Sequence, residues 1–242
     1  MMGWMHDAFK YFKQLPADRL AMQNQFSFSM MYFYDEKFML PLSHDEVVHG
    51  KSPMIYKMPG NEWEKFANLR LLYGWMYTHP GAKLLFMGNE FAQTSEWNYQ
   101  TELDWELLQY DAHNLMQEYV RALNHLYKEQ PALHENQFER KGFEWVTLDH
   151  PDKGIIAYKR KGKHRADDIL VVLNVSAETY LQWPLTIKGK NHWQPLLNSN
   201  DTAFWGSGVA VNEHITIKNI DKKRKLCEII FDIPPLSMQL FR

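Results

Sequence analysis

Residues 38–51 read FMLPLSHDEVVHGK. Phe38 to Leu42 form a short apolar run, which is typical of a strand buried on both faces. A polar loop follows at once, and it holds His44, Asp45, His49 and Lys51. In parallel α/β folds the reactive side chains lie in the loops after the strands, so this loop is the first candidate for a functional site.

A second unit of the same kind follows. Asn61 and Glu64 have the spacing of a capping box, so we expect a helix to begin there and to end at Pro80-Gly81. Its expected apolar stripe consists of Phe66, Leu69, Tyr73 and Met76. Residues 83–87 form a second apolar run, and a further helix is expected from about residue 114 to 129. Strand, loop and helix in this order predict a parallel α/β part.

After residue 142 the pattern changes to alternating strands. They are expected at residues 143–148, 155–158, 169–175, 227–233 and 236–241. The predicted fold class is therefore α/β plus all-β, with an α/β part over residues 1–135 and an antiparallel β-sandwich over residues 136–242. We expect the second part to have an apolar set of its own and to fold alone.

Composition excludes several classes of partner. The chain has 27 Lys and Arg against 29 Asp and Glu, and this near-neutral balance gives no reason to expect nucleic acid or an anionic membrane. No apolar run approaches the ~18 residues of a membrane-spanning helix, and the N-terminus does not resemble a signal peptide. The single cysteine, Cys227, reads as a buried thiol and indicates a reducing compartment, so we expect a cytoplasmic protein.

The polar loop also has two plainer interpretations. A helical zinc site needs two histidines four residues apart, whereas His44 and His49 are five apart and no cysteine is near. We therefore expect no metal and no cofactor. A lone His-Asp pair would most simply be part of a solvated loop.

The longer stretch from residue 40 to residue 51 favours a functional site over a solvated loop. Residues 40–45 resemble the fourth conserved region of the α-amylase superfamily, which ends in a His-Asp pair at the tip of the seventh barrel strand. With the extension to Lys51, the string is similar to that of the glycogen (1,4-α-glucan) branching enzymes. Further stretches resemble that family: MGWM at 2–5, MPG at 58–60, KFANLR at 65–70, YGWM at 73–76, KLLFMGNEFAQ at 83–93, EWN at 96–98, LDW at 103–105 and GFEW at 142–145. The resemblance is weaker in the β region.

The resemblance implies a fold and a chemistry. Residues 1–135 would be the C-terminal part of a (β/α)8 barrel, from the end of strand six to helix eight, and residues 136–242 its β-sandwich domain. The family cuts α-1,4 links in an α-glucan, such as glycogen or amylose, and rejoins the chain to a 6-hydroxyl by retaining double displacement. By this resemblance His44 and Asp45 hold sugar hydroxyls in the transition state. His49, Lys51 and Trp97 are candidate glucan contacts.

Two parts of the family's machinery do not map onto this sequence. The chain has neither the Gly-Phe-Arg-x-Asp motif of the nucleophile nor the Ala-Glu-Glu motif of the acid/base. We therefore expect the chain alone to be inactive, with the missing N-terminal part of the same enzyme as its partner. We also expect three acidic residues to be structural: Glu90 through capping of backbone N–H groups or local pairing, and Glu96 and Asp104 through local helix capping.

The same residues allow two further interpretations of the chain. It could be a non-catalytic glucan-binding or scaffold piece, because Trp and Tyr stack on sugar rings. It could also belong to another transferase or hydrolase of the superfamily, since isoamylases and maltosyl-trehalose enzymes keep a His-Asp pair. The aromatic residues of the β region are expected to fill the sandwich or the interface between the two parts; they are Trp145, Trp183, Trp193 and Trp205.

Overall fold

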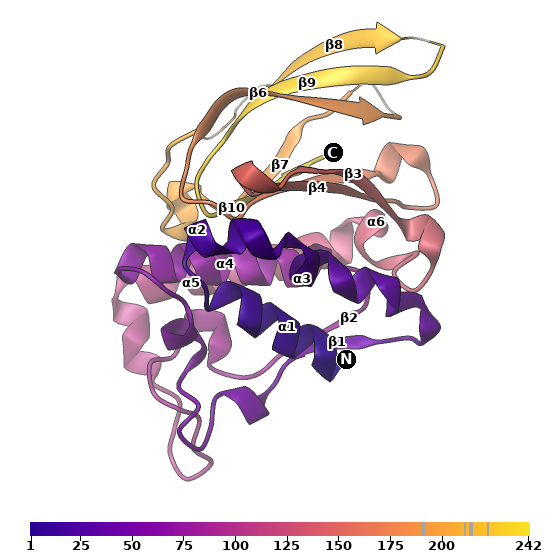
Figure 1. The fold of residues 1–242 in the computed structure, drawn as a ribbon. Coiled ribbons are helices and arrows are strands. Elements are labelled where there is room, and N and C mark those ends of the chain that lie inside the picture. Colours follow the sequence, from indigo (N-terminus) through magenta and orange to yellow (C-terminus); the bar gives the residue numbers. More distant parts are fainter. Residues whose placement is uncertain (190–191, 211, 213–214, 222) are drawn as a thin grey trace.

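The computed structural model describes residues 1–189, 192–210, 212, 215–221 and 223–242. A layer of helices lies against a five-stranded sheet, and a three-stranded sheet covers the far side of that sheet (Figure 1). The α-helices are α1 (Met2–Phe12), α2 (Pro16–Arg19), α3 (Gln23–Ser27), α4 (Glu62–Thr78), α5 (Asp111–Glu129) and α6 (Pro131–His134). The strands are β1 (Met39–Leu42), β2 (Ala82–Leu85), β3 (Phe143–His150), β4 (Ile155–Arg160), β5 (Ile169–Asn174), β6 (Tyr180–Lys188), β7 (Pro195–Asn198), β8 (Thr216–Asp221), β9 (Leu226–Ile233) and β10 (Ser237–Phe241).

The two apolar runs of the N-terminal part form a parallel pair. β1 pairs with β2 in a register that runs from Met39 opposite Ala82 to Leu42 opposite Leu85, and α4 connects the two strands. The parallel unit that the strand and helix pattern predicts is thus present. Within the described residues there is no closed barrel, and no strand precedes β1. The assignment of this unit to a (β/α)8 barrel therefore stays a prediction.

Helix α4 begins as the sequence predicts but is buried differently. Asn61 accepts a hydrogen bond from the Glu64 backbone, and the Glu64 carboxylate accepts one from Asn61 N at 2.7 Å, so the capping box is complete. The expectation of a single apolar stripe is wrong, because every residue from Phe66 to Thr78 is buried. The helix packs against α1 and α5 and also against β5 and β10, so neighbours cover it all round.

The β region is an antiparallel sandwich, as predicted. One sheet has the order β3-β4-β5-β10-β7 and the other the order β6-β9-β8. Side chains of β5 alternate between two cores: Leu170 and Val172 face the second sheet, whereas Val171 and Leu173 belong to the core that contains α4. Trp193 and Cys227 are buried between the sheets, and burial raises the pKa of the Cys227 thiol.

The expectation of a separate apolar set for the β region is wrong in part. Tyr158 and Leu240 lie on the helical face of the five-stranded sheet, and they share one continuous core with Trp4 and Trp75. All residues of β5 are buried, so the strand needs cover on both faces; the second sheet covers one side and α4 the other. The division at residues 135 and 136 remains a prediction, but the two parts share a core.

The aromatic residues of the β region mostly fill these cores. Trp145 and Trp205 pack against the core shared with the helices, and Trp183 packs against the core between the sheets. In the described part of the chain, no helix has both the length and the apolar character to cross a membrane.

The end of α4 carries a buried histidine. His79 is the C-cap residue, its Nε2 lies 3.0 Å from Ser29 Oγ, and its Nδ1 lies 2.8 Å from the Pro80 carbonyl oxygen. Burial lowers the pKa of His79 to about 3, so the ring is neutral in the native state at ordinary pH. An unfolded histidine takes up a proton near pH 6.5, and so acid favours unfolding.

We predict that His79 makes the fold sensitive to acid. Because its native pKa is depressed, its contribution to stability is complete above about pH 6.5 and falls by up to about 1.4 kcal/mol per pH unit below it. Urea unfolding at pH 7, 6 and 5 should show a smaller loss of stability in His79→Gln than in the wild type. The exposed His6 supplies the control, since His6→Gln should follow the wild type. Equal slopes in wild type and His79→Gln would contradict the assignment.

Candidate active site

The His44–Asp45 pair lies directly after β1. Ser43 follows the strand in an extended conformation, and residues 44–46 make one 3-10 turn. The Asp45 carboxylate accepts a hydrogen bond from Ser43 Oγ at 3.0 Å and lies 3.3 Å from His44 Nε2. Both side chains are about half exposed, at 53% and 51%. The pair is therefore held in place locally and remains accessible to a ligand.

Two aromatic rings flank His44. The ring centroid of Phe86, which follows β2, lies 5.6 Å from that of His44, and the centroid of Trp97 lies 6.4 Å away. Phe86 and Trp97 contact each other edge-on at 5.2 Å. Because β1 and β2 are parallel, their carboxyl ends meet at one edge and bring these three side chains together.

His49 and Lys51 lie further along the same loop. Lys51 Nζ is 3.2 Å from the Glu46 carboxylate, so Lys51 belongs to an ion pair beside Asp45. His49 is exposed and has a left-handed backbone, with φ of 55°. Within the described residues, neither side chain bonds to the His44–Asp45 pair. Of the predicted glucan contacts, only Trp97 packs against His44.

Glu96 and Asp104 have partners that the sequence did not indicate. The expectation of local helix capping is wrong for Glu96, because its carboxylate accepts from Gly50 N at 2.9 Å and from Ser52 N at 2.7 Å. It is also wrong for Asp104, which accepts from Ser95 N at 3.2 Å and from the Ser95 hydroxyl. Glu90 is partly exposed, and no hydrogen bond or ion pair within the described residues involves its carboxylate.

Comparisons with known proteins identify a family for this chain. The family model described as "Alpha amylase, C-terminal all-beta domain" matches residues 145–242. The chain is 43% identical over 241 residues to the 1,4-alpha-glucan branching enzyme GlgB of Aquifex aeolicus, an alignment that covers 98% of the chain. It is 40% identical over 242 residues to the protein of the same name from Oceanobacillus iheyensis, with 100% of the chain covered.

The chain belongs to the 1,4-alpha-glucan branching enzyme family. It spans 38% of the length of each of these two relatives, and the matched all-beta domain shows that it corresponds to their C-terminal part. A solved structure described as an alpha-amylase from H. orenii has a TM-score of 0.55 over 99% of this chain and 46% of its own length. At 15% identity that likeness concerns the fold alone.

Three residues around the His44–Asp45 pair are seen only in the structure. The sequence did not assign Phe86, Glu46 or Lys57 to the site, although Phe86 lies in the second apolar run and so had a detectable signal. The side chain of Lys57 is only 2% exposed, and its Nζ donates to the Lys51 carbonyl at 2.6 Å. Among the described residues, no cluster of His, Cys, Asp and Glu has the grouping to hold a metal ion.

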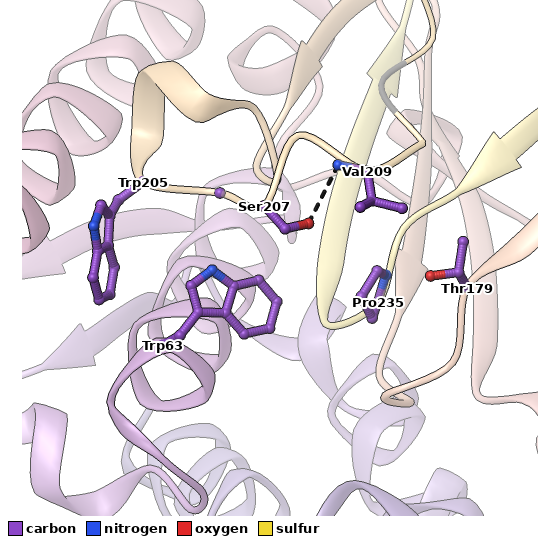
Figure 2. Close-up of a pocket in the computed structure, with 7 residues that line it drawn as sticks. Trp63, Thr179, Trp205, Ser207, Val209 and Pro235 are labelled. Carbon is purple, nitrogen blue, oxygen red and sulfur yellow. Dashed lines mark hydrogen bonds between the residues drawn. The ribbon is translucent and has the colours of Figure 1, made fainter.

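A separate pocket lies where the helices meet the β region. Its volume is about 460 Å³, and it is lined by Trp63, Thr179, Trp205, Gly206, Ser207, Val209 and Pro235. Figure 2 shows Trp63 between Trp205 on one side and Pro235 on the other. Two indole rings and the hydroxyls of Thr179 and Ser207 offer apolar faces and hydrogen bonds, the combination that suits a sugar. The sequence did not single out Trp63. The one feature that could have indicated it is the position of an aromatic residue in the first turn of a helix.

Proposed function

We propose that this chain is the C-terminal part of an enzyme that cuts α-1,4 links in a glucan and rejoins the freed chain as an α-1,6 branch. The observation that carries the proposal is the exposed His44–Asp45 pair at the carboxyl end of β1, beside the rings of Phe86 and Trp97. The family of the chain supports it. The substrate would be an α-glucan such as glycogen or amylose, and the single, buried cysteine favours a cytoplasmic enzyme.

The pair would act on the transition state. Retaining double displacement passes through a flattened, positively charged sugar ring. The Asp45 carboxylate would accept hydrogen bonds from ring hydroxyls, and these strengthen as positive charge develops on the ring. His44 would donate to the same ring. Phe86 and Trp97 pack against the His44 ring and would limit its rotation.

The strand pair fits a larger sheet. β1 and β2 would be strands seven and eight of a (β/α)8 barrel, with α4 and α5 as the helices that follow them. A two-stranded parallel sheet leaves unpaired N–H and C=O groups along both edges, and these edges would accept strands from the N-terminal part of the enzyme. The barrel part would end after α6, at residue 135, and the β-sandwich domain would follow.

The chain alone would be inactive. Retaining chemistry needs two carboxyl groups about 5 Å apart across the scissile bond, one as nucleophile and one as acid/base. The sequence contains neither motif that supplies them in this family, and the role of Asp45 is to hold hydroxyls. Glu96 and Asp104 are engaged by backbone N–H groups, which favours structural roles for both.

The test is a chimera. The chain replaces the matching 241 residues of the Aquifex relative, and branching is measured as new short chains released from amylose by a debranching enzyme. We predict activity in the chimera and a loss of turnover of about 100-fold or more for Asp45→Asn, by analogy with the loss of an oxyanion-hole donor. Asp35→Asn is the matched control, because Asp35 is exposed and precedes the opposite end of β1. Asp45→Asn within a few-fold of the wild-type chimera would refute the assignment.

A second candidate function is glucan binding without chemistry, favoured by the pocket beside Trp63 and Trp205. Stacking on an indole needs no catalytic group, so the 242-residue chain should bind amylose by itself. We predict that Trp63→Ala weakens this binding about tenfold, or ~1.4 kcal/mol, in affinity electrophoresis. Phe28→Ala removes an aromatic side chain that is 53% exposed elsewhere and should leave binding unchanged. Equal binding by the wild type and Trp63→Ala would exclude this pocket as the glucan site.

A further inference from the structure

The loop after Asp45 has an unusual backbone. His49, Gly50 and Ser52 all have left-handed φ values, of 55°, 81° and 70°. Glycine adopts this region freely, but histidine and serine do so at a cost, and contacts from outside the loop must stabilise them. Alternation of conformations in such a segment turns neighbouring N–H groups toward one point and makes a concave site for an anion.

The Glu96 carboxylate fills this concave site. Its Oε2 accepts from Gly50 N at 2.9 Å and its Oε1 accepts from Ser52 N at 2.7 Å, so each oxygen holds one N–H group. These two hydrogen bonds, that of Gly50 first, lower the pKa of Glu96 below its usual value. The ionised carboxylate is therefore the form that the loop binds.

Trp97, the residue after Glu96, binds the other end of the loop. Trp97 N donates to the Val47 carbonyl at 2.9 Å, while the Trp97 ring packs against His44 and Phe86. Glu96 and Trp97 thus bind the loop at three backbone positions and also set the ring beside His44. The two segments are far apart in sequence: 46 residues separate Gly50 from Glu96.

Ionic contacts hold the loop from within. Glu46, the residue after Asp45, lies 3.2 Å from Lys51 Nζ and 3.9 Å from Lys57 Nζ. Lys57 Nζ also donates to the Lys51 carbonyl at 2.6 Å. The segment from Glu46 to Ser52 is therefore fixed at both ends, and it follows Asp45 directly in the chain.

We propose that Glu96 is a positioning residue for the His44–Asp45 pair: its carboxylate binds the backbone of residues 50–52 and holds the loop in the conformation that presents the pair to a glucan. The inference rests on the proposed function. It assigns Glu96 no contact with the reacting atoms. Removal of its charge should loosen the loop and lower turnover, with little effect on substrate affinity.

The first measurement needs no activity. Amide hydrogen exchange of Gly50 and Ser52 is followed by NMR in the 242-residue chain. In Glu96→Gln only one side-chain oxygen can accept, so protection of at least one of these amides should fall tenfold or more, while amides of α4 stay protected. Glu102→Gln is the matched control, because Glu102 is exposed in the same connection between β2 and α5. Unchanged protection in Glu96→Gln would overturn the role of Glu96 in the loop.

The second measurement uses the chimera with the Aquifex relative. Misplacement of a catalytic group by about 1 Å costs up to about 100-fold in rate, so Glu96→Ala should lower kcat by about 10- to 100-fold with KM within about threefold. Sodium formate should restore part of kcat by supplying a carboxylate to the empty site, whereas the same concentration of sodium chloride should not. Formate should not restore Asp45→Asn.

The outcomes separate the two proposals. An inactive wild-type chimera would contradict the proposed function, while the exchange experiment would still decide whether Glu96 orders the loop. Full kcat in Glu96→Ala, or a loss that formate does not reverse, would overturn the positioning role even if the chimera is active.

Discussion

The fold depends on a guanidinium that is buried without a counter-charge. Arg160, in β4, donates to the carbonyl oxygens of Thr78 at 2.7 Å, Leu133 at 3.2 Å and Gly142 at 3.3 Å. These oxygens belong to the end of α4, to α6 and to the turn before β3, and no ion pair within the described residues involves Arg160. A buried charge is costly unless every donor finds an acceptor, so helices and sheet must meet here. Burial lowers the pKa of Arg160 to about 10, and the group stays charged at neutral pH.

The sequence predicts the elements that have a local signal, but not how those elements pack together. β1, β2 and the start of α4 each have a local signal, namely a short apolar run or the spacing of Asn61 and Glu64. The shared core has none, because the apolar run of β5 shows that both faces are covered but not by which elements. The same limit applies to the site. The His44–Asp45 pair is visible as a motif, whereas the partners of Glu96 are backbone N–H groups, which leave no mark in the sequence.

The architecture separates stability from function. The helices and the five-stranded sheet share their core around α4. The loops after β1 and β2 extend away from the two sheets of the β region (Figure 1). Changes in these loops can therefore alter the site while the core stays intact. The contacts among His44, Phe86 and Trp97 show how two short strands, held by one buried helix, bring distant residues into one arrangement.

The central claim is that the chain supplies transition-state contacts but no catalytic carboxyl pair. The most direct test is incubation of the purified 242-residue chain with amylose, with iodine absorbance and reducing ends after debranching as readouts. The account predicts no new branches and no hydrolysis. Branching by the chain alone that Asp45→Asn abolishes would contradict it, and would mean that Glu90, Glu96 or Asp104 has a catalytic role.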